Sequence, residues 1–384
     1  MNDLTIEEAA TAAARPTDRR PPPTPTARAV RRQSPTQNFA RTVVPLVAAI
    51  VVLSLYSNSQ NPAFLTSSNW QNILSQVCVL GILAAGQTFL IIGGQMDLSV
   101  GSLVSFIGVL AATRLDAGWS TTTVVVVCLA LGVAVGLLWG LTVAFLRVPP
   151  FVLTLGGLSV FASLALVISD NRPIPVLDGG LTELGFGQWF GFRAPAVILV
   201  VTVVVLGLLL HFTRFGRNVF ALGSAPRAAY LAGVPTRRLT ITLFVLNSTL
   251  AAAAGLIMMS RLAAGDPRSG EGLELSVIAV TVLGGAALAG GRGSMVGTFL
   301  GVLVFGVINA SLTFLQVPGA YQSLVTGGIL IFAVTVTAVA DLRAGRVATT
   351  QGRAAAFGTA VAGVVLRRGR GDAGNGEGSG ASSL

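Results

Sequence analysis

The chain has 384 residues, of which 53% are hydrophobic and only 10% are charged, and its formal net charge is +10. This composition excludes an ordinary soluble domain, because apolar runs of about 20 residues, the length that crosses a hydrocarbon core of about 30 Å, recur along most of it. All 25 basic residues are arginines in tails and loops, which indicates membrane orientation and lipid contact and argues against nucleic-acid binding. An all-α polytopic membrane protein is therefore predicted.

The two ends of the chain differ in composition from its middle. Residues 1–41 hold seven arginines and the run Pro21-Pro22-Pro23-Thr24-Pro25, which predicts a disordered basic cytoplasmic tail. Residues 342–384 are first basic and then rich in glycine and serine, which predicts a second cytoplasmic tail. The part between them, residues 42–341, is predicted to be the transmembrane domain.

About ten apolar segments are predicted to cross the membrane, some of them short or discontinuous. They are residues 43–56, 73–92, 100–112, 123–146, 151–168, 194–212, 239–259, 273–288, 295–315 and 321–340. The third segment covers only about 20 Å at 1.5 Å per residue, so we expect a partial or tilted helix capped by Asp97 or Ser99. Membranes tolerate broken helices only where these line a cavity or are buried by protein.

The placement of the arginines predicts which side of the membrane each loop faces. Ten spans put both termini on one side, and if that side is the cytoplasm, twenty arginines lie inside and five outside. Both termini are therefore expected to be cytoplasmic. The outer loops carry acids, which fit either docking of a partner or simple solvation: Asp116, Asp170, Asp178, Glu183, Asp266 and Glu271.

A basic polar segment, residues 214–238, separates the sixth and seventh predicted spans. Its five arginines place it on the cytoplasmic side. Ser224 is a possible cap, Pro226 suits the first position of a helix, and Gly233 followed by Pro235 would end it. One short docking helix of one or two turns is therefore predicted between Pro226 and Gly233. A polar helix in this position has no lipid to contact, and we expect it to contact a protein.

The sequence offers few groups for chemistry within the membrane. A chain without lysine cannot form the nucleotide-binding loop G-x-x-x-x-G-K-(S/T), so no catalytic residue is predicted. Cys78, Cys128 and His211 show neither a disulfide pattern nor a metal-site spacing, and we expect no metal and no cofactor on this chain. The cysteines are interpreted as packing residues and the histidine as an interfacial one.

Polar side chains near the spans are candidates for a solute pathway. Ionisable groups inside the spans are scarce, which disfavours an ion-coupled carrier and favours a neutral solute contacted by hydroxyls and amides. Each such group can equally form an interhelical hydrogen bond. The candidate pathway residues are Gln87, Thr88, Asp97, Ser99, Asn247, Glu274 and Asn309, with Ser248 and Ser311 as further polar neighbours.

Three blocks of the sequence resemble the permease subunits of ribose-type ABC importers, in the superfamily of branched-chain amino-acid and sugar permeases. Residues 86–102 contain G-Q-T-F and G-G-Q-M-D-L-S-V-G-S, residues 151–156 read F-V-L-T-L-G, and residues 270–294 contain G-E-G-L-E-L, V-L-G-G and G-G-R-G-S. These blocks keep the family's order and spacing between about residues 70 and 340. Ser276 departs from the family pattern, in which an aspartate commonly follows E-L.

The resemblance implies a function and a set of partners. We expect a multi-pass subunit of the bacterial plasma membrane that imports a monosaccharide or a similar small polar solute. The implied partners are a cytoplasmic ABC ATPase, which holds the ATP and magnesium, an extracytoplasmic solute-binding protein, a second permease copy in a homodimer, and membrane lipid. Residues 214–238 then correspond to the family's coupling helix.

Within this segment, Arg227, Ala228, Ala229 and Gly233 match the A-A-x-x-x-G spacing of the coupling helix. Ala225, Pro226 and Arg227 replace the acids usual before the two alanines. Two alternatives to a sugar permease remain open at this point. One is an ABC permease for branched-chain amino acids or nucleosides, and the other is an ion-coupled secondary carrier, which would leave the coupling-like loop unexplained.

Overall fold

The computed structural model describes residues 35–176, 179–318 and six isolated positions between 321 and 335. Contacts divide the chain into two units, Met1–Ala40 and Arg41–Leu384, and the packing described below is that of the second unit. Most of the predicted N-terminal tail, all of the predicted C-terminal tail, and most of the tenth predicted span lie outside the described residues.

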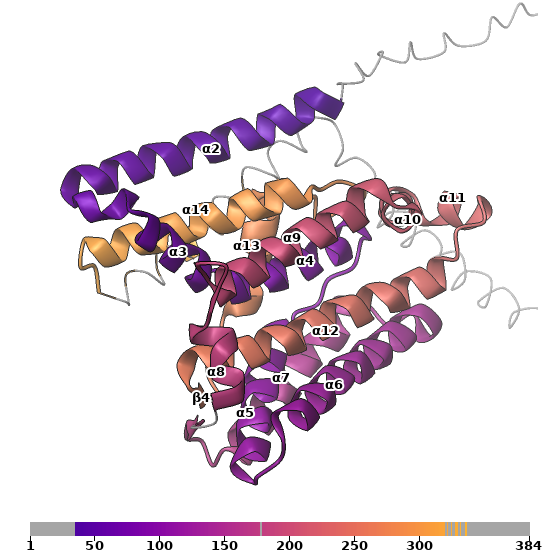
Figure 1. The fold of residues 1–384 in the computed structure, drawn as a ribbon. Coiled ribbons are helices and arrows are strands. Elements are labelled where there is room, and N and C mark those ends of the chain that lie inside the picture. The colour runs from indigo at the N-terminus through magenta and orange to yellow at the C-terminus, as the bar shows by residue number, and fades with distance from the viewer. Residues whose placement is uncertain are drawn as a thin grey trace, which may run out of the picture. The chain divides into compact units, whose positions relative to one another are not determined.

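The described part of the chain consists almost entirely of helices (Figure 1). The helices are α2 (Pro35–Gln60), η2 (Pro62–Leu65), α3 (Ser67–Gln76), α4 (Cys78–Ile92), α5 (Val100–Asp116), α6 (Thr121–Leu141), η3 (Thr142–Leu146), α7 (Pro150–Ile168), α8 (Gly179–Phe186), α9 (Ala194–Phe212), α10 (Arg214–Ser224), α11 (Pro226–Leu231), α12 (Thr236–Leu262), α13 (Leu273–Leu283) and α14 (Met295–Phe314). Two antiparallel pairs of two-residue strands join β1 (Ile174–Pro175) to β4 (Ala264–Gly265) and β2 (Gln188–Trp189) to β3 (Phe192–Arg193). The all-α class is confirmed.

Six helical segments in the described part are long and apolar enough to cross a membrane. They are Val43–Gln60, Thr121–Leu146, Pro150–Ile168, Ala194–Phe212, Thr236–Leu262 and Met295–Phe314. Each coincides with one of the predicted spans, so the polytopic membrane class is confirmed. The count of about ten spans and the cytoplasmic position of both termini stay predictions.

The second predicted span, residues 73–92, consists of two helices with a bend between them. Helices α3 and α4 bend by 52° at Val77, and only as a broken pair do they add a seventh crossing. Helix α3 is polar and begins at its cap Thr66, whereas every residue of α4 is buried. The bend directs Ile73 of α3 into a small cluster with Phe64 and Val307, apart from the main core around α4.

Two further helices are shorter than a membrane is thick. Helix α5 has 17 residues and runs four residues past the predicted end at Ala112. Helix α13 has only 11 residues, about 16 Å at 1.5 Å per residue, and it stops before the end of the predicted segment 273–288. It ends at Leu283 because Gly284 and Gly285 follow, and Gly285 has a φ of +89°, which favours glycine and stops a helix.

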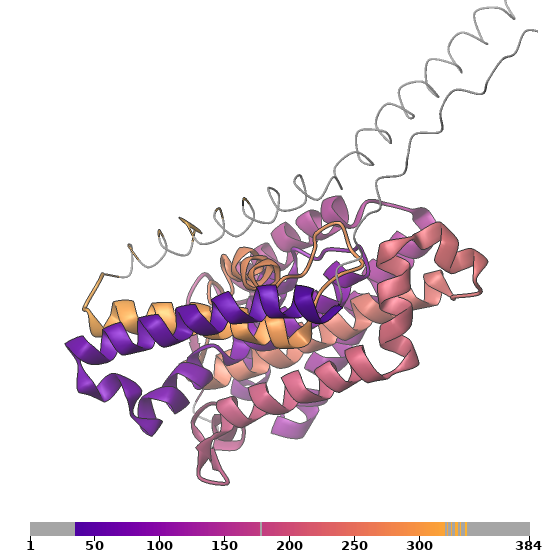
Figure 2. The same ribbon diagram turned by 90° about the horizontal axis from the view of Figure 1, so that it is seen from above.

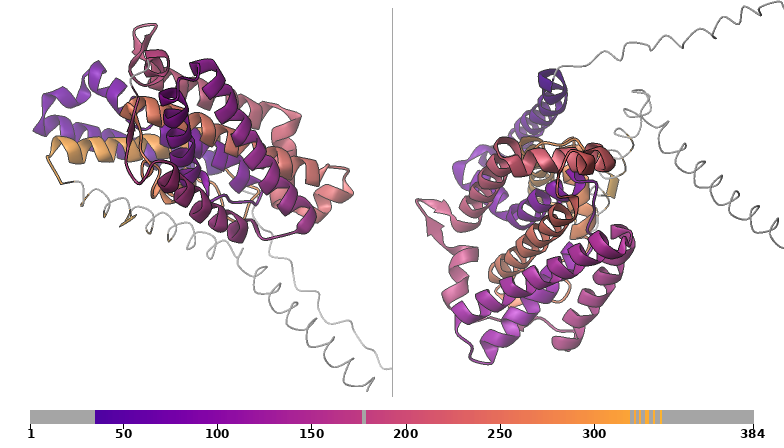
Figure 3. Two further views of the ribbon diagram at one scale, coloured as in Figure 1. Left: turned by 90° about the horizontal axis from the view of Figure 1, so that it is seen from below. Right: turned by 90° about the vertical axis from the view of Figure 1, so that its right-hand side faces the viewer.

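Helix α12 lies at the centre of the bundle, between α4 and the pair formed by α5 and α6 (Figure 3, right). Glycines spaced four residues apart on α6 explain how closely two of these helices approach. A Cβ added at Gly132 would lie 2.7 Å from Ala252, and one added at Gly136 would lie 2.5 Å from the Cα of Val245. These glycines therefore allow α6 and α12 to pack backbone against backbone.

The connections between the helices gather at two opposite ends of the bundle (Figures 1 and 2). Helices α10 and α11 lie at one end, and α8 and β4 lie at the other. Beside the bundle, α2 packs on α14, where Ser57 Oγ donates to Ser311 Oγ over 2.7 Å. His211, at the end of α9, accepts a hydrogen bond at Nε2 from the N–H of Met295 over 3.3 Å, so it contacts the start of α14.

Candidate functional site

A buried polar cluster forms where the chain between α4 and α5 meets α12 and α6. Asp97 is 1% exposed, and its Oδ1 accepts hydrogen bonds from the N–H of Ser99 over 2.8 Å and from Ser99 Oγ over 2.6 Å. Its Oδ2 accepts from Asn247 Nδ2 over 3.1 Å. Trp139 Nε1 in turn donates to Ser99 Oγ over 3.2 Å. Four residues from three parts of the chain thus share one network.

The network fixes the entry to α5. Of the two predicted caps, Asp97 bonds the N–H just before the helix, whereas the side chain of Ser99 makes no capping bond to it. Thr154 of α7 adds a bond, because its Oγ1 accepts from the N–H of Leu98 over 3.1 Å. Burial of a carboxylate is costly unless donors surround it, and here both oxygens have them. Residues 97–99 are therefore fixed by hydrogen bonds from α6, α7 and α12.

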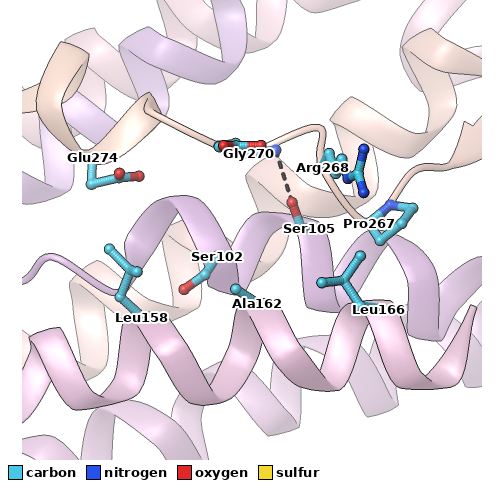
Figure 4. Close-up of a pocket in the computed structure, with 10 residues that line it drawn as sticks. Ser102, Ser105, Leu158, Ala162, Leu166, Pro267, Arg268, Gly270 and Glu274 are labelled. Carbon is cyan, nitrogen blue, oxygen red and sulfur yellow. Dashed lines mark hydrogen bonds between the residues drawn. The ribbon is translucent and has the colours of Figure 1, made fainter. Parts of the chain in front are cut away.

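A cavity of about 490 Å³ lies beside the start of α5 (Figure 4). Two hydroxyls of α5 and three apolar side chains of α7 form part of its wall, and the connection from α12 to α13 forms the rest together with Glu274 in the first turn of α13. Figure 4 shows Glu274 and Gly270 across the cavity from the α7 side chains. The lining residues are Ser102, Ser105, Leu158, Ala162, Leu166, Pro267, Arg268, Gly270, Glu271 and Glu274.

The N-terminal ends of two short helices, α5 and α13, meet at this cavity. Ser105 Oγ accepts a hydrogen bond from the N–H of Gly270 over 2.8 Å. A Cβ added at Gly101 would lie 2.5 Å from the carbonyl oxygen of Gly270 and would overlap Oε2 of Glu274. Only glycine therefore fits where the first turn of α5 contacts the first turn of α13. Helix N-termini carry a partial positive charge, which suits the Glu274 carboxylate.

The cavity and the buried polar cluster are connected through one side chain. Ser102 lines the cavity, and its Oγ donates to the carbonyl oxygen of Ser99 over 3.0 Å. The ends of α5 and α13 thus present hydroxyls, a carboxylate and a guanidinium to a space with an apolar wall on α7. Convergent polar groups beside apolar side chains are typical of sites for small molecules.

The predicted pathway residues are divided among several places. Glu274 lines the cavity, and Asp97, Ser99 and Asn247 form the adjacent cluster. Thr88 instead shares a hydrogen bond with Thr298 of α14, with their Oγ1 atoms 2.8 Å apart. Gln87 is fully buried with no hydrogen-bond partner among the described residues, and Asn309 is half-buried on α14. Their assignment to a pathway stays a prediction.

Two polar lining residues, Ser105 and Arg268, belong to no motif or candidate site that the sequence marked. The signal for Ser105 is its spacing, because residues three apart share a helix face and Ser102 belongs to a recognised motif. Nothing local marks Arg268, whose Nη2 also donates to Asn171 Oδ1 over 3.1 Å, because the connection between α12 and α13 approaches α5 only in the folded chain.

The coupling segment, residues 214–238, contains two helices before α12 begins, not the single one predicted. Ser224 is the last residue of α10 and does not cap α11, whose N-cap, Ala225, makes no side-chain bond. Pro226 does occupy the first position of α11. The helix ends at Leu231 and is followed by Gly233, which has a φ of +82°. The predicted start and stop of α11 are thus confirmed, and the predicted cap is wrong.

The four predicted docking residues differ in exposure. Arg227, Ala228 and Gly233 are exposed, but Ala229 is 6% exposed and faces the chain's own packing. Tyr230 and Leu231, which the sequence did not single out, are 68% and 78% exposed. All five arginines of the segment are exposed as well. The accessible part of the segment is therefore basic, and α11 adds to it one of the arginines and two large exposed side chains.

Comparisons with known proteins place this chain in a family. Residues 69–334 match the family described as the permease component of the branched-chain amino acid transport system. The L-arabinose ABC transporter permease of Azospirillum brasilense is 38% identical over 289 residues, which are 75% of this chain and 85% of that protein. The ribose import permease of Bacillus subtilis is 37% identical over 287 residues, 74% of this chain and 89% of that protein.

This chain belongs to that permease family. A more distant relative, the xylose transport system permease of Escherichia coli, is 30% identical over 355 residues, covering 76% of the permease described here and 90% of that protein. No solved structure shows a significant match. The family resemblance predicted from residues 86–102, 151–156 and 270–294 is confirmed, and an ion-coupled carrier is no longer a competing class.

Among the residues that the structure describes, no three histidine, cysteine, aspartate or glutamate side chains are grouped to hold a metal ion. The expectation that ATP and magnesium are held by a partner chain stays a prediction. The permease itself is a multi-pass membrane protein of a bacterial ABC importer family.

Proposed function

We propose that this permease is the membrane subunit that carries a monosaccharide into the cell, and that the solute passes through the cavity between α5, α7 and α13. The observation that carries this proposal is the meeting of two short helices at Gly101 and Gly270, beside the hydroxyls of Ser102 and Ser105 and the carboxylate of Glu274. Broken helices at a polar cavity are the usual way in which transporters build solute sites.

The chemistry of the cavity fits a neutral, polyhydroxylated ring. Ser102 and Ser105 can both donate and accept hydrogen bonds, Glu274 accepts them from sugar hydroxyls, and Arg268 donates. The apolar side chains of Leu158 and Leu166 complement the C–H face of such a ring. The named relatives import arabinose, ribose or xylose, which supports a sugar over a branched-chain amino acid.

Energy is supplied by a separate cytoplasmic ATPase that docks on α10 and α11. The exposed side chains of Tyr230 and Leu231, in a segment with five exposed arginines, support this assignment, because adjacent large apolar side chains together with arginines are typical of docking sites. ATP and magnesium are held by that ATPase, and the permease has no catalytic role. An extracytoplasmic binding protein delivers the sugar, and two copies of the permease form a homodimer in the inner membrane.

The partner assignment is tested by purifying the tagged permease from its native membrane in mild detergent. Mass spectrometry of the co-purified chains is expected to find an ABC ATPase in stoichiometric amount and, after cross-linking, a secreted solute-binding protein. Preparations that contain neither chain after cross-linking would overturn the importer assignment.

The cavity assignment is tested by filling the cavity from α7. Ala162→Phe puts a ring into the cavity wall, whereas Ser163→Phe puts the same ring on the neighbouring exposed position of the same helix. Uptake of radiolabelled arabinose, ribose and xylose is measured in the native cells at matched membrane levels. We expect uptake to be lost in Ala162→Phe and retained in Ser163→Phe. Equal uptake by both variants would show that the sugar passes through another part of the protein.

A further inference from the structure

Four glycines bring three separate segments of the permease into direct backbone contact at the end of the bundle that carries α10. This glycine junction consists of Gly94, just after α4, Gly223, in the last turn of α10, and Gly290 and Gly291, between α13 and α14. The G-G-R-G-S block marked the family resemblance, and the proposed function gives it no role.

The contacts within the glycine junction leave no space for a side chain at Gly223, Gly290 or Gly291. The N–H of Gly291 donates to the carbonyl oxygen of Ile92 over 2.8 Å. A Cβ added at Gly223 would overlap that same oxygen and would lie 2.6 Å from the nitrogen of Gly291. One added at Gly290 would lie 2.9 Å from the carbonyl oxygen of Gly223 and 3.1 Å from the Cα of Gly94.

Backbone contacts of this kind transmit displacement stiffly. A side chain between two segments can change rotamer and absorb a shift, but backbone atoms in contact must move together or separate. Gly94, Gly290 and Gly291 have φ values of +74°, +85° and +75°, which glycine adopts without strain and other residues rarely adopt. The Gly290–Gly291 turn is closed further by a bond from the N–H of Ala287 to the carbonyl oxygen of Arg292.

The two helices that precede the glycine junction in the chain, α4 and α13, end with the same pattern of backbone hydrogen bonds. After α4, the N–H groups of Gly93, Gly94 and Gln95 bond to carbonyls four, three and five residues back. After α13, Gly284, Gly285 and Ala286 repeat this pattern. The first ending leads within three residues to Asp97 and within six to the start of α5 at Val100, and the second closes the other short helix at the cavity. The segment after α4 and the segment after α13 therefore meet α10 at one place.

We infer that Gly223, Gly290 and Gly291 are positioning residues that transmit movement of the docking helices to the two short helices at the cavity. Only Ala225 separates α10 from α11, so a displacement of α11 by the ATPase reaches Gly223 directly. From Gly223 it passes to the segment before Asp97 and to the segment after α13. The inference rests on the proposed docking of an ATPase on α10 and α11.

The decisive variant is Gly223→Ala. Alanine favours a helix over glycine by about 1 kcal/mol, so α10 itself is not weakened, while the added methyl group forces α10 away from Ile92. Gly156→Ala in α7 is the matched control, because a Cβ there meets no atom within 4 Å. For each variant, membrane level, co-purified ATPase, ATP hydrolysis and sugar uptake are measured on the full complex.

We expect the assembled Gly223→Ala complex to transport at least about fivefold less sugar per ATP hydrolysed, the lower range of coupling between distant sites. Gly156→Ala is expected to behave as the wild type. A structural role alone would lower the amount of complex without changing the ratio of sugar to ATP. A Gly223→Ala complex with the wild-type ratio would overturn the inference.

Hydrogen exchange of the wild-type complex provides a test without any substitution. A non-hydrolysable ATP analogue is expected to change exchange in residues 214–231 and, with it, in residues 92–99 and 284–294. A change confined to residues 214–231 would overturn the inference even if Gly223→Ala failed to reach the membrane. A wild-type preparation without any ATPase would instead overturn the proposed function, so the two failures are distinguishable.

Discussion

Asp97 and Asn247 lie 150 residues apart in the chain, yet Asn247 Nδ2 donates to Asp97 Oδ2 over 3.1 Å within the core of the permease. Asp97 belongs to the segment that leads into α5, and Asn247 lies in the central helix α12. The contact therefore ties the start of a short helix at the cavity to the helix around which the bundle packs.

Replacement of Asp97 by asparagine is expected to destabilise this contact. Because Oδ1 receives the two bonds from Ser99, the new amide nitrogen would face Asn247 Nδ2, and one buried donor would lose its acceptor. The expected cost is about 1 to 3 kcal/mol. Thermal unfolding of the purified protein should show a lower midpoint, and sugar uptake should fall.

The second half of this test is the exchange of the two residues. Asn247→Asp alone brings two carboxylates together, whereas combined with Asp97→Asn it restores one donor and one acceptor. The double variant is therefore expected to unfold at a higher temperature than either single variant. Strictly additive effects in the double-mutant cycle would show that the two side chains do not interact.

Gly101 is expected to be intolerant of a methyl group. In Gly101→Ala the new Cβ would overlap Glu274 Oε2 and approach the carbonyl oxygen of Gly270, which pushes α5 and α13 apart at the cavity. Such overpacking costs about 1 to 3 kcal/mol. Uptake and the unfolding midpoint should both fall, while Gly156→Ala, at a position with open space, should leave both unchanged. Normal uptake by Gly101→Ala would mean that the cavity tolerates separation of the two helices.

Trp139 offers a way to separate one hydrogen bond from packing. Trp139→Phe removes the donor to Ser99 Oγ but keeps a ring beside Phe161, so a loss of about 1 kcal/mol is expected. Trp139→Ala also leaves a cavity and should cost about 3 to 5 kcal/mol. Trp119→Phe is the control, because Trp119 is 41% exposed and contacts Arg114. Equal unfolding midpoints for Trp139→Phe and the wild type would argue that this bond contributes nothing.

Exposed and buried positions of α11 should respond differently to substitution. Tyr230→Ala and Leu231→Ala alter only accessible side chains, so we expect loss of co-purified ATPase with an unchanged unfolding midpoint. Ala229→Asp places a charge at a buried position and should lower the midpoint as well. An ATPase that remains bound to the double variant of Tyr230 and Leu231 would place the docking surface elsewhere.

The long apolar segments were predictable because their signal is local. Residues 151–168 and 194–212 coincide with α7 and α9 to within one residue, since a run of that length can bury its backbone in lipid only as a helix. The family was also readable from short motifs such as residues 93–102. In the same way, Pro226 and Gly233 correctly marked the start and the stop of α11, because both act through their own backbone geometry.

Only the tertiary structure decided where the polar residues meet. Sequence composition marked Asp97, Ser99, Asn247 and Glu274 as candidates, but nothing local distinguishes a side chain at the cavity from one such as Thr88, which pairs with Thr298. The bend at Val77 and the approach of Gly270 to Ser105 likewise depend on contacts between distant segments. Lipid and helix geometry determine the spans residue by residue, whereas the site arises from the packing of helices against one another.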